Sequence, residues 1–182
     1  EGVGVSLKHY CANNQEHIRM CIDSVVDERT LREIYLTPFE YIVKTEQPTT
    51  VMCSYNRLGG EYLSDHKRML TDVLRGEWGF KGIVVSDWGA VNDRVLGLKN
   101  GNDLEMPSSS GAGTKKIIEA VKNGTLDVAA LDKCVLRMIK FAFECKANEG
   151  KGYSIDYKAH HNVARKAAAN SIVLLKNNDN LL

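Results

Sequence analysis

The sequence lacks the features that mark membrane-spanning and nucleic-acid-binding proteins. Its longest aliphatic stretches are short ones such as Ile83-Val84-Val85, far below the about 18 consecutive apolar residues of a membrane helix. Its 24 lysines and arginines nearly balance 23 aspartates and glutamates, which leaves a formal charge of +1. A nucleic acid or an anionic membrane surface would be matched by a strong basic excess, so we expect neither as a partner.

The five cysteines form no recognisable framework. Their number is odd and no two are spaced as C-x-x-C, so the sequence predicts neither a disulfide scaffold nor a zinc ribbon. The opening residues Glu1-Gly2-Val3-Gly4 show no basic segment followed by a long apolar core, so we expect no signal peptide there. These observations favour a reducing compartment, and the sequence predicts a cytoplasmic rather than a secreted protein.

Several catalytic signatures are absent as well. The glycines of Gly2-Val3-Gly4 lack the third member of a dinucleotide loop, and Gly111–Lys116 does not follow the order of a phosphate loop. No G-x-S-x-G elbow of a serine hydrolase is present. His160 and His161 are adjacent and would diverge by about 100° on a helix, so they make a poor pair of metal ligands.

What the sequence does contain is an alternation of short apolar runs with helical patterns. The apolar runs predict strands at Val3–Leu7, Thr49–Ser54, Gly82–Ser86, Asn102–Met106 and Ser171–Leu175. A helix is predicted from a cap at Asp27, with Pro38 kinking or ending it. Further helices are predicted from a cap at Ser64 to about Gly76, and over Thr114–Lys122, Leu126–Lys146 and Asp156–Asn170. This order predicts an α/β fold in which helices cover a parallel sheet.

Polar and aromatic residues follow the predicted strands, at the sheet edge that carries the chemistry of parallel α/β folds. Asp87 comes directly after an apolar run and is followed by Trp88. An ionised carboxylate beside an aromatic ring suits sugar hydrolysis, in which the ring packs on the C–H face of the sugar. The alternative is an aspartate that caps the next helix beside a packed tryptophan.

Three cationic side chains, Lys8, His9 and Arg19, could donate hydrogen bonds to sugar hydroxyls. Each has an alternative: a surface lysine, a core histidine and an arginine at a helix end. Glu105 also follows a predicted strand, where a structural hydrogen bond is favoured over a substrate contact.

The chain resembles family 3 of the glycoside hydrolases, in its β-glucosidase branch. The segments that carry the resemblance are Lys8–Arg19, Asp27–Glu33, Met52–Asn56, Leu74–Gly82, Ser86–Ala90 and Ala167–Asn178. The sister branch that acts on N-acetylhexosaminides continues its Lys-His pair as F-P-G-H-G, whereas Lys8-His9 continues here as Tyr-Cys-Ala-Asn-Asn.

The resemblance implies a retaining exo-β-glycosidase that needs no cofactor and no metal, with a β-glucoside or oligosaccharide as substrate. Asp87 matches the family's nucleophile. Lys8, His9 and Arg19 match residues that bind sugar hydroxyls, Tyr55 matches a tyrosine near the nucleophile, and Trp88 matches a stacking tryptophan. The alternatives are a β-xylosidase or exo-glucanase of the same family, a non-catalytic sugar-binding remnant, and a lyase that forms a Schiff base on Lys8.

The resemblance also implies a division of the chain. Residues 1–147 match the second half of a (β/α)₈ TIM-type barrel with about four parallel strands, 148–155 a linker, and 156–182 the start of an α/β sandwich domain. The family's general acid/base residue and part of its sugar subsite find no counterpart in the sequence. We therefore expect the isolated chain to be inactive and to self-associate through open barrel edges.

Overall fold

The computed structural model describes residues 3–147, 149–150 and 154–180. The chain divides into two compact units, Glu1–Glu149 and Gly150–Leu182. Of the predicted linker 148–155, residues 148 and 151–153 lie outside the described residues. The family-like site residues all belong to the first unit, whose architecture therefore decides their placement.

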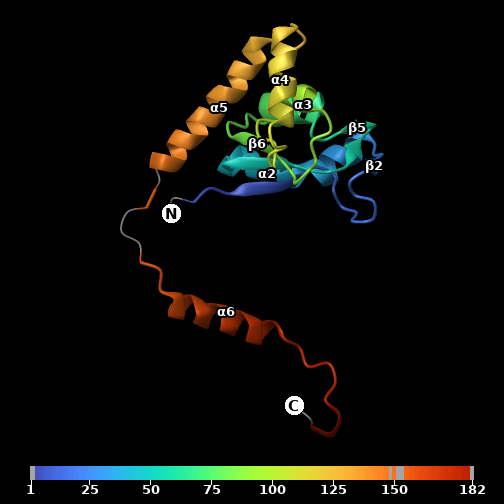
Figure 1. The fold of residues 1–182 in the computed structure, drawn as a ribbon. Helices are drawn as coiled ribbons and strands as arrows, with labels where there is room; N and C mark the ends of the chain where they lie inside the picture. Colours follow the sequence, from blue (N-terminus) through green and yellow to red (C-terminus); the bar gives the residue numbers. More distant parts are fainter. Residues whose placement is uncertain (1–2, 148, 151–153, 181–182) are drawn as a thin grey trace. The chain divides into compact units, whose positions relative to one another are not determined.

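A three-stranded parallel sheet forms the centre of the first unit (Figure 1). Its strands are β1 (Ser6–Tyr10), β3 (Thr50–Cys53) and β6 (Ile83–Ser86), in the order β1-β3-β6. The register pairs Leu7 with Val51 and Met52 with Val85. A second, smaller sheet contains β2 (Asp23–Ser24), β4 (Arg57–Leu58) and β5 (Glu61–Tyr62). The predicted parallel α/β sheet is confirmed.

The first strand begins later than predicted. Val3 and Val5 are exposed and lie before β1, whereas Lys8, His9 and the fully buried Tyr10 lie within it. Pairing with β3 causes the shift, because the ladder runs from Ser6 opposite Thr50 to Tyr10 opposite Cys53, with an irregularity in between. Lys8 and His9 are therefore strand residues at this irregularity, not residues that follow the strand.

The predicted strand Asn102–Met106 is reduced to one isolated parallel bridge, between Leu104 and Val85 of β6. On the side of β6 that faces Asn102–Met106, side-chain hydrogen bonds supplement the short backbone pairing. Asp103 Oδ2 accepts from the Val84 amide at 2.9 Å, and the Met106 amide donates to Ser86 Oγ at 2.8 Å.

Pro38 was predicted to kink or end the helix that Asp27 caps, and the helix continues past it. It comprises α1 (Glu28–Thr30), a π-helical segment η1 (Leu31–Leu36) and α2 (Thr37–Glu46). Asp27 caps it as predicted, since its carboxylate accepts from the Thr30 amide at 3.0 Å. Pro38 lies in the first turn of α2, where a missing amide costs little, and the wider π turns precede it.

The second helix, η2 (Arg68–Glu77), begins four residues after its predicted cap. Ser64 does not cap it, because the serine hydroxyl donates to Asp65 Oδ1 at 2.9 Å. The predicted inward face is confirmed by the burial of Met69, Leu70, Val73 and Leu74. These side chains join the main core, where the Tyr10 ring packs edge-on against Phe39 and Trp78.

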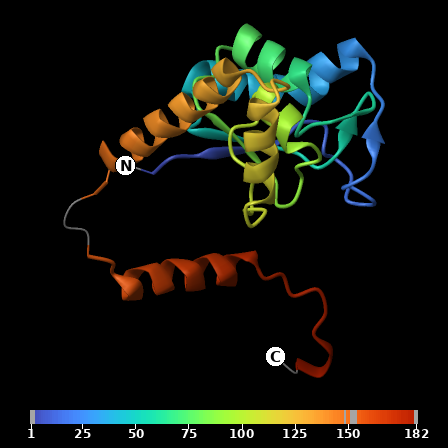
Figure 2. The ribbon, with the colours of Figure 1, turned by 45° about the horizontal axis from the view of Figure 1, so that its top comes forward.

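Three further helices follow β6: α3 (Arg94–Lys99), α4 (Ala112–Lys122) and α5 (Val128–Ala147). α3 contacts both α4 and α5, and α5 also reaches β6 (Figure 2). A separate small core of Leu98, Ala120, Leu126 and Cys134 lies between them. Among the described residues, no helix combines the length and apolarity needed to cross a membrane.

The second unit contains α6 (Tyr157–Ser171) and the short 3-10 helix η3 (Asn178–Asn180). Asp156 caps α6 by accepting from the Ala159 amide at 2.9 Å. The predicted strand Ser171–Leu175 is wrong: Ser171 ends α6, and Ile172–Leu175 is exposed and extends without strand pairing among the described residues. An apolar run becomes a strand only where another strand pairs with it.

A buried carboxylate connects three elements around β6. The Asp103 side chain, 1% exposed, is 2.7 Å from Arg75 Nη2 of η2 and 2.6 Å from Arg137 Nη2 of α5. It also accepts from the Val84 amide of β6. Burial lowers the pKa of the Arg75 guanidinium, and the charge of Asp103 opposes this shift.

We predict that Asp103→Asn destabilises the first unit by about 3–5 kcal/mol, because it leaves two largely buried guanidinium groups without their counter-charge. Urea denaturation at one fixed protein concentration, followed by fluorescence of the buried Trp78, measures the loss. Asp72→Asn is the matched control, since Asp72 pairs with Lys67 at the surface and should cost about 1 kcal/mol or less. Equal losses for the two variants would contradict the prediction.

Candidate active site

Asp87 occupies the position directly after β6, at the carboxyl edge of the parallel sheet. The residue is 7% exposed. Its Oδ1 accepts from the Trp88 amide at 2.7 Å, and its Oδ2 lies 3.5 Å from His9 Nε2 of β1. The carboxylate is thus oriented by one backbone donor and faces one imidazole, at an edge where parallel strands present their functional groups.

The backbone around Asp87 forms a tight turn. The Asp87 carbonyl accepts from the Ala90 amide at 3.0 Å, and Gly89 adopts a φ of +79°, a conformation that favours glycine. The alternative in which Asp87 caps the next helix is wrong. Asp93 caps α3 instead, with its Oδ1 accepting from the Val95 and Leu96 amides.

Tyr55 follows β3 and reaches the same turn. Its hydroxyl donates to the Trp88 carbonyl at 2.8 Å, and the Arg19 guanidinium lies 4.9 Å from the centre of its ring. Burial, and next the charge of Asp87, raise the pKa of the Tyr55 phenol. The phenol therefore stays protonated at neutral pH and acts as a hydrogen-bond donor.

The predicted site residues thus come together in part. His9, Arg19, Tyr55 and Asp87 form a connected group through the contacts above. Trp88 is 52% exposed, as a residue with a stacking ring would be. Lys8 is exposed on β1, next to His9, and is not enclosed in an apolar pocket as Schiff-base lysines are.

Glu105 has the structural role that the sequence favoured. Its Oε2 accepts from Ser109 Oγ at 3.0 Å and lies 3.8 Å from Arg94 Nε. The side chain thereby holds the loop that leads into α4. A pocket of about 280 Å³ lies beside this loop, lined by residues that include Gly89, Met106 and Pro107.

Sequence reasoning missed Asp65, which is buried and holds the far end of the Asp87 loop. Its Oδ2 accepts from Asn92 Nδ2 at 2.9 Å and from the Asp93 amide at 3.1 Å. Burial raises the pKa of its carboxyl group. The only nearby signal in the sequence is Ser64, the residue before Asp65, which is predicted as a helix cap.

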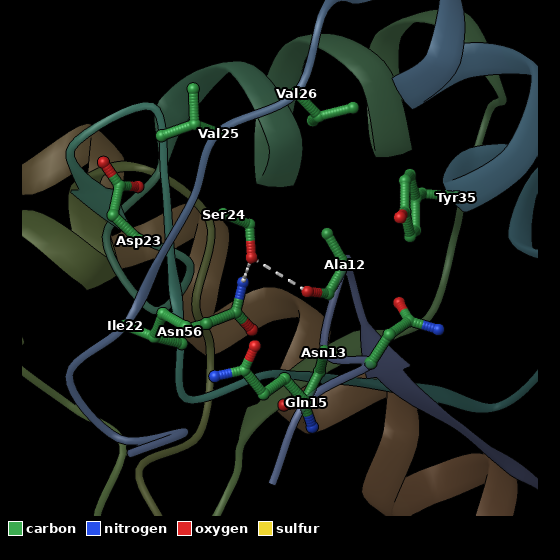
Figure 3. Close-up of a pocket in the computed structure, with 11 residues that line it drawn as sticks. Ala12, Asn13, Gln15, Ile22, Asp23, Ser24, Val25, Val26, Tyr35 and Asn56 are labelled. Atoms are coloured by element: carbon green, nitrogen blue, oxygen red, sulfur yellow. Dashed lines mark hydrogen bonds between the residues drawn. The ribbon is translucent and has the colours of Figure 1, made fainter. Parts of the chain in front are cut away.

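Another pocket lies between the loop after β1 and the helix η1 (Figure 3). Its volume is about 340 Å³. Asn56 Nδ2 donates to Ser24 Oγ, which in turn donates to the Ala12 carbonyl, and the Tyr35 ring lies on the opposite side of the pocket from Asp23. None of the six predicted site residues lines it.

Two cysteines, Cys11 and Cys53, are buried next to the strand ends of the sheet. Burial raises the pKa of both Cys11 and Cys53 to about 12, so neither forms a thiolate nucleophile near neutral pH. Among the described residues, no group of three or more His, Cys, Asp or Glu side chains is arranged to hold a metal ion.

Comparison with known proteins decides the family. Residues 1–141 match the model of the glycosyl hydrolase family 3 N-terminal domain. The chain belongs to glycoside hydrolase family 3. The match spans the whole described sheet and the helices α1 to α4, so the resemblance seen in the strand-end motifs is confirmed.

Family 3 relatives match over the full length of this chain. It is 56% identical over 182 residues to thermostable beta-glucosidase B of Acetivibrio thermocellus, and 48% identical over 183 residues to an exo-alpha-(1->6)-L-arabinopyranosidase of Bifidobacterium breve. All of the chain is covered in both cases, but only 24% of each relative. The chain therefore spans about a quarter of the length of these family members.

Solved family 3 structures share the fold. The Bifidobacterium adolescentis GH3 beta-glucosidase is 46% identical with a TM-score of 0.85, and the match covers 100% of this chain and 27% of that one. Beta-glucosidase 3B of Thermotoga neapolitana, solved in complex with alpha-D-glucose, is 42% identical with a TM-score of 0.84 over 99% of this chain and 26% of that one.

Proposed function

We propose that the full-length protein carrying this chain is a retaining exo-β-glycosidase that removes terminal non-reducing β-D-glucosyl residues. The observation that carries the proposal is the placement of Asp87, a nearly buried carboxylate at the carboxyl edge of the sheet, oriented by the Trp88 amide and facing His9. The family's named β-glucosidases support the choice of sugar.

In this mechanism Asp87 attacks the anomeric carbon and the bond to the leaving oxygen breaks, which forms a covalent glycosyl-enzyme. Water then attacks the same carbon and releases the sugar and the Asp87 carboxylate. An acid about 5–5.5 Å from the nucleophile must protonate the leaving oxygen, and afterwards remove a proton from the water. We assign that role to a residue outside this chain.

The other site residues would bind and orient the sugar. Lys8, His9 and Arg19 would donate hydrogen bonds to its hydroxyl groups. Tyr55 would hold the turn of Asp87 through the Trp88 carbonyl, as it does in the structure. The exposed Trp88 indole would pack against the C–H face of the ring.

We further propose that the first unit is the second half of a (β/α)₈ barrel and that the second unit begins an α/β sandwich domain. Three parallel strands in sequential order, with helices between them, support the first proposal, as does the bridge that places Leu104 beside β6. Because a barrel presents its functional residues at the carboxyl ends of its strands, the arrangement also fits the site.

The sugar itself has a second candidate. Relatives of the chain at 48% identity are named exo-alpha-(1->6)-L-arabinopyranosidases, so an α-L-arabinopyranoside joins the β-xyloside as an alternative substrate. Both of these sugars lack the hydroxymethyl group of glucose. Comparison of kcat/KM for the three nitrophenyl glycosides separates the glucoside from the two pentosides, because a pocket built around that group discriminates against sugars without it. The ratio of kcat/KM between the two pentosides then separates the arabinoside from the xyloside.

We predict that Asp87→Asn abolishes turnover by the full-length protein and changes its stability by about 1 kcal/mol or less, because the change removes the nucleophile but keeps its size. A 2-fluoro glucoside should label Asp87 in the unaltered protein, as detected by mass spectrometry of its peptides. Asp72→Asn serves as the control and should retain full activity. Activity of Asp87→Asn within tenfold of the unaltered protein would exclude Asp87 as the nucleophile.

Trp88→Ala is expected to weaken glucose binding by about 1–3 kcal/mol through the loss of ring contact. Isothermal titration calorimetry of the full-length protein measures this effect. Tyr41→Ala is a suitable control, since Tyr41 is an exposed aromatic residue on α2. An unchanged affinity in Trp88→Ala would leave no stacking role for the indole.

The isolated 182-residue chain should release no glucose from cellobiose and should self-associate. Within the described residues β1 pairs with β3 alone, so its other edge presents unpaired backbone groups. Size-exclusion chromatography with light scattering measures the mass in solution. A cooperatively melting monomer of 20.3 kDa would contradict self-association, and measurable glucose release would contradict inactivity.

A further inference from the structure

The strand that presents Asp87 has different neighbours on its two sides. On one side β3 pairs with all four residues of β6, ending with Cys53 opposite Ser86. On the other side the backbone ladder is short: the Leu104 amide donates to the Val84 carbonyl at 3.0 Å, and the Ser86 amide donates to the Leu104 carbonyl at 2.9 Å. Backbone pairing on this side therefore stops one residue before Asp87.

The Ser86 side chain extends the connection beyond that point. Its Oγ accepts from the Met106 amide at 2.8 Å and donates to the Met106 carbonyl at 3.2 Å. The same carbonyl accepts from the Gly89 amide at 2.9 Å. The backbone of one residue, Met106, thus holds the chain on both sides of Asp87 and Trp88.

Burial makes these hydrogen bonds hard to replace. Ser86 is 0% exposed, so water cannot easily take the place of its hydroxyl. Without the hydroxyl, the Met106 amide would lose this acceptor, and Ser86 would keep only its backbone bond to the Leu104 carbonyl on this side. Tyr55 would still hold the Trp88 carbonyl, and the Met106 carbonyl would still hold the Gly89 amide. The end of β6 at Ser86, and with it Asp87, would be free to shift.

We propose that Ser86 is a positioning residue for Asp87, and that its hydroxyl fixes the carboxylate in line with the anomeric carbon through the backbone N–H and C=O of Met106. The inference rests on the proposed function, in which Asp87 is the nucleophile. Nucleophilic attack requires the reacting atoms at about 3–3.5 Å in an aligned geometry, and a misplacement of about 1 Å can lower the rate about 100-fold. Ser86 itself touches no reacting atom.

The test compares Ser86→Ala with Thr71→Val in the full-length protein. The Thr71 hydroxyl donates a 2.6 Å hydrogen bond to the Asn100 carbonyl. Thr71→Val therefore removes a hydroxyl that does not contact the Asp87 turn. We expect kcat on a nitrophenyl β-glucoside to fall about 10-fold or more in Ser86→Ala with KM within about threefold, because geometry and not binding is lost. The Thr71→Val variant should keep kcat within about twofold.

Ser86→Cys gives a second variant that keeps a hydrogen-bonding side chain of similar size but with a weaker donor and acceptor. Its kcat should fall between those of Ser86→Ala and the unaltered protein. If kcat of Ser86→Ala equals that of Thr71→Val, the positioning role is wrong. If both Ser86 variants lose cooperative melting while Thr71→Val retains it, the hydroxyl is required for folding and the positioning role is likewise overturned.

Hydrogen exchange measured by mass spectrometry separates this inference from the proposed function. Peptides that contain Met106 and Gly89 should exchange faster in Ser86→Ala than in Thr71→Val, whatever the reaction is. Unchanged exchange would contradict the attachment itself. If Asp87→Asn retains turnover, the proposed function fails; if Asp87→Asn is inactive but Ser86→Ala keeps full kcat, only the positioning role fails.

Discussion

The pairing of the Asp103 carboxylate with Arg75 and Arg137 is the interaction on which the rest of the first unit depends. A carboxylate that is 1% exposed is tolerable only when its charge is balanced and its oxygens accept hydrogen bonds. Here the two arginines come from η2 and α5, and the Val84 amide of β6 completes the set. The charge therefore fixes two helices to the central strand at one point.

The cluster of Asp103, Arg75 and Arg137 lies near the beginning of β6, and it helps to fix the position of Asp87 at the other end of that strand. Asp103 binds β6 near its beginning, and the segment that follows Asp103 continues beside the strand to Met106. Cys134 Sγ and the Arg94 guanidinium add further contacts to the Asp103 carbonyl. Strand β6 is thus fastened on both sides before the chain turns at Asp87.

The site itself is assembled from three strands that are far apart in sequence. His9 comes from β1, Tyr55 follows β3, and Asp87 follows β6, with Arg19 on the loop after β1. A parallel sheet brings such residues to one edge without any one of them being near another in the chain. The Asp65 carboxylate supports the arrangement at the far end of the Asp87 loop, because it accepts hydrogen bonds from the Asn92 side chain and the Asp93 amide.

The sequence by itself determined the sheet class, the strands around Thr50–Cys53 and Ile83–Ser86 and the inward face of η2, because apolar periodicity is a local signal. The six candidate site residues came from strand-end motifs and the family resemblance, and their roles stay predictions. The tertiary structure alone decided the rest. The start of β1 at Ser6 depends on its register with β3, and Ile172–Leu175 lacks a strand partner among the described residues. The hydrogen bonds of Ser86, Asp65 and Asp103 were equally hidden, because their partners lie 19 to 34 residues away and only folding brings them within hydrogen-bonding distance.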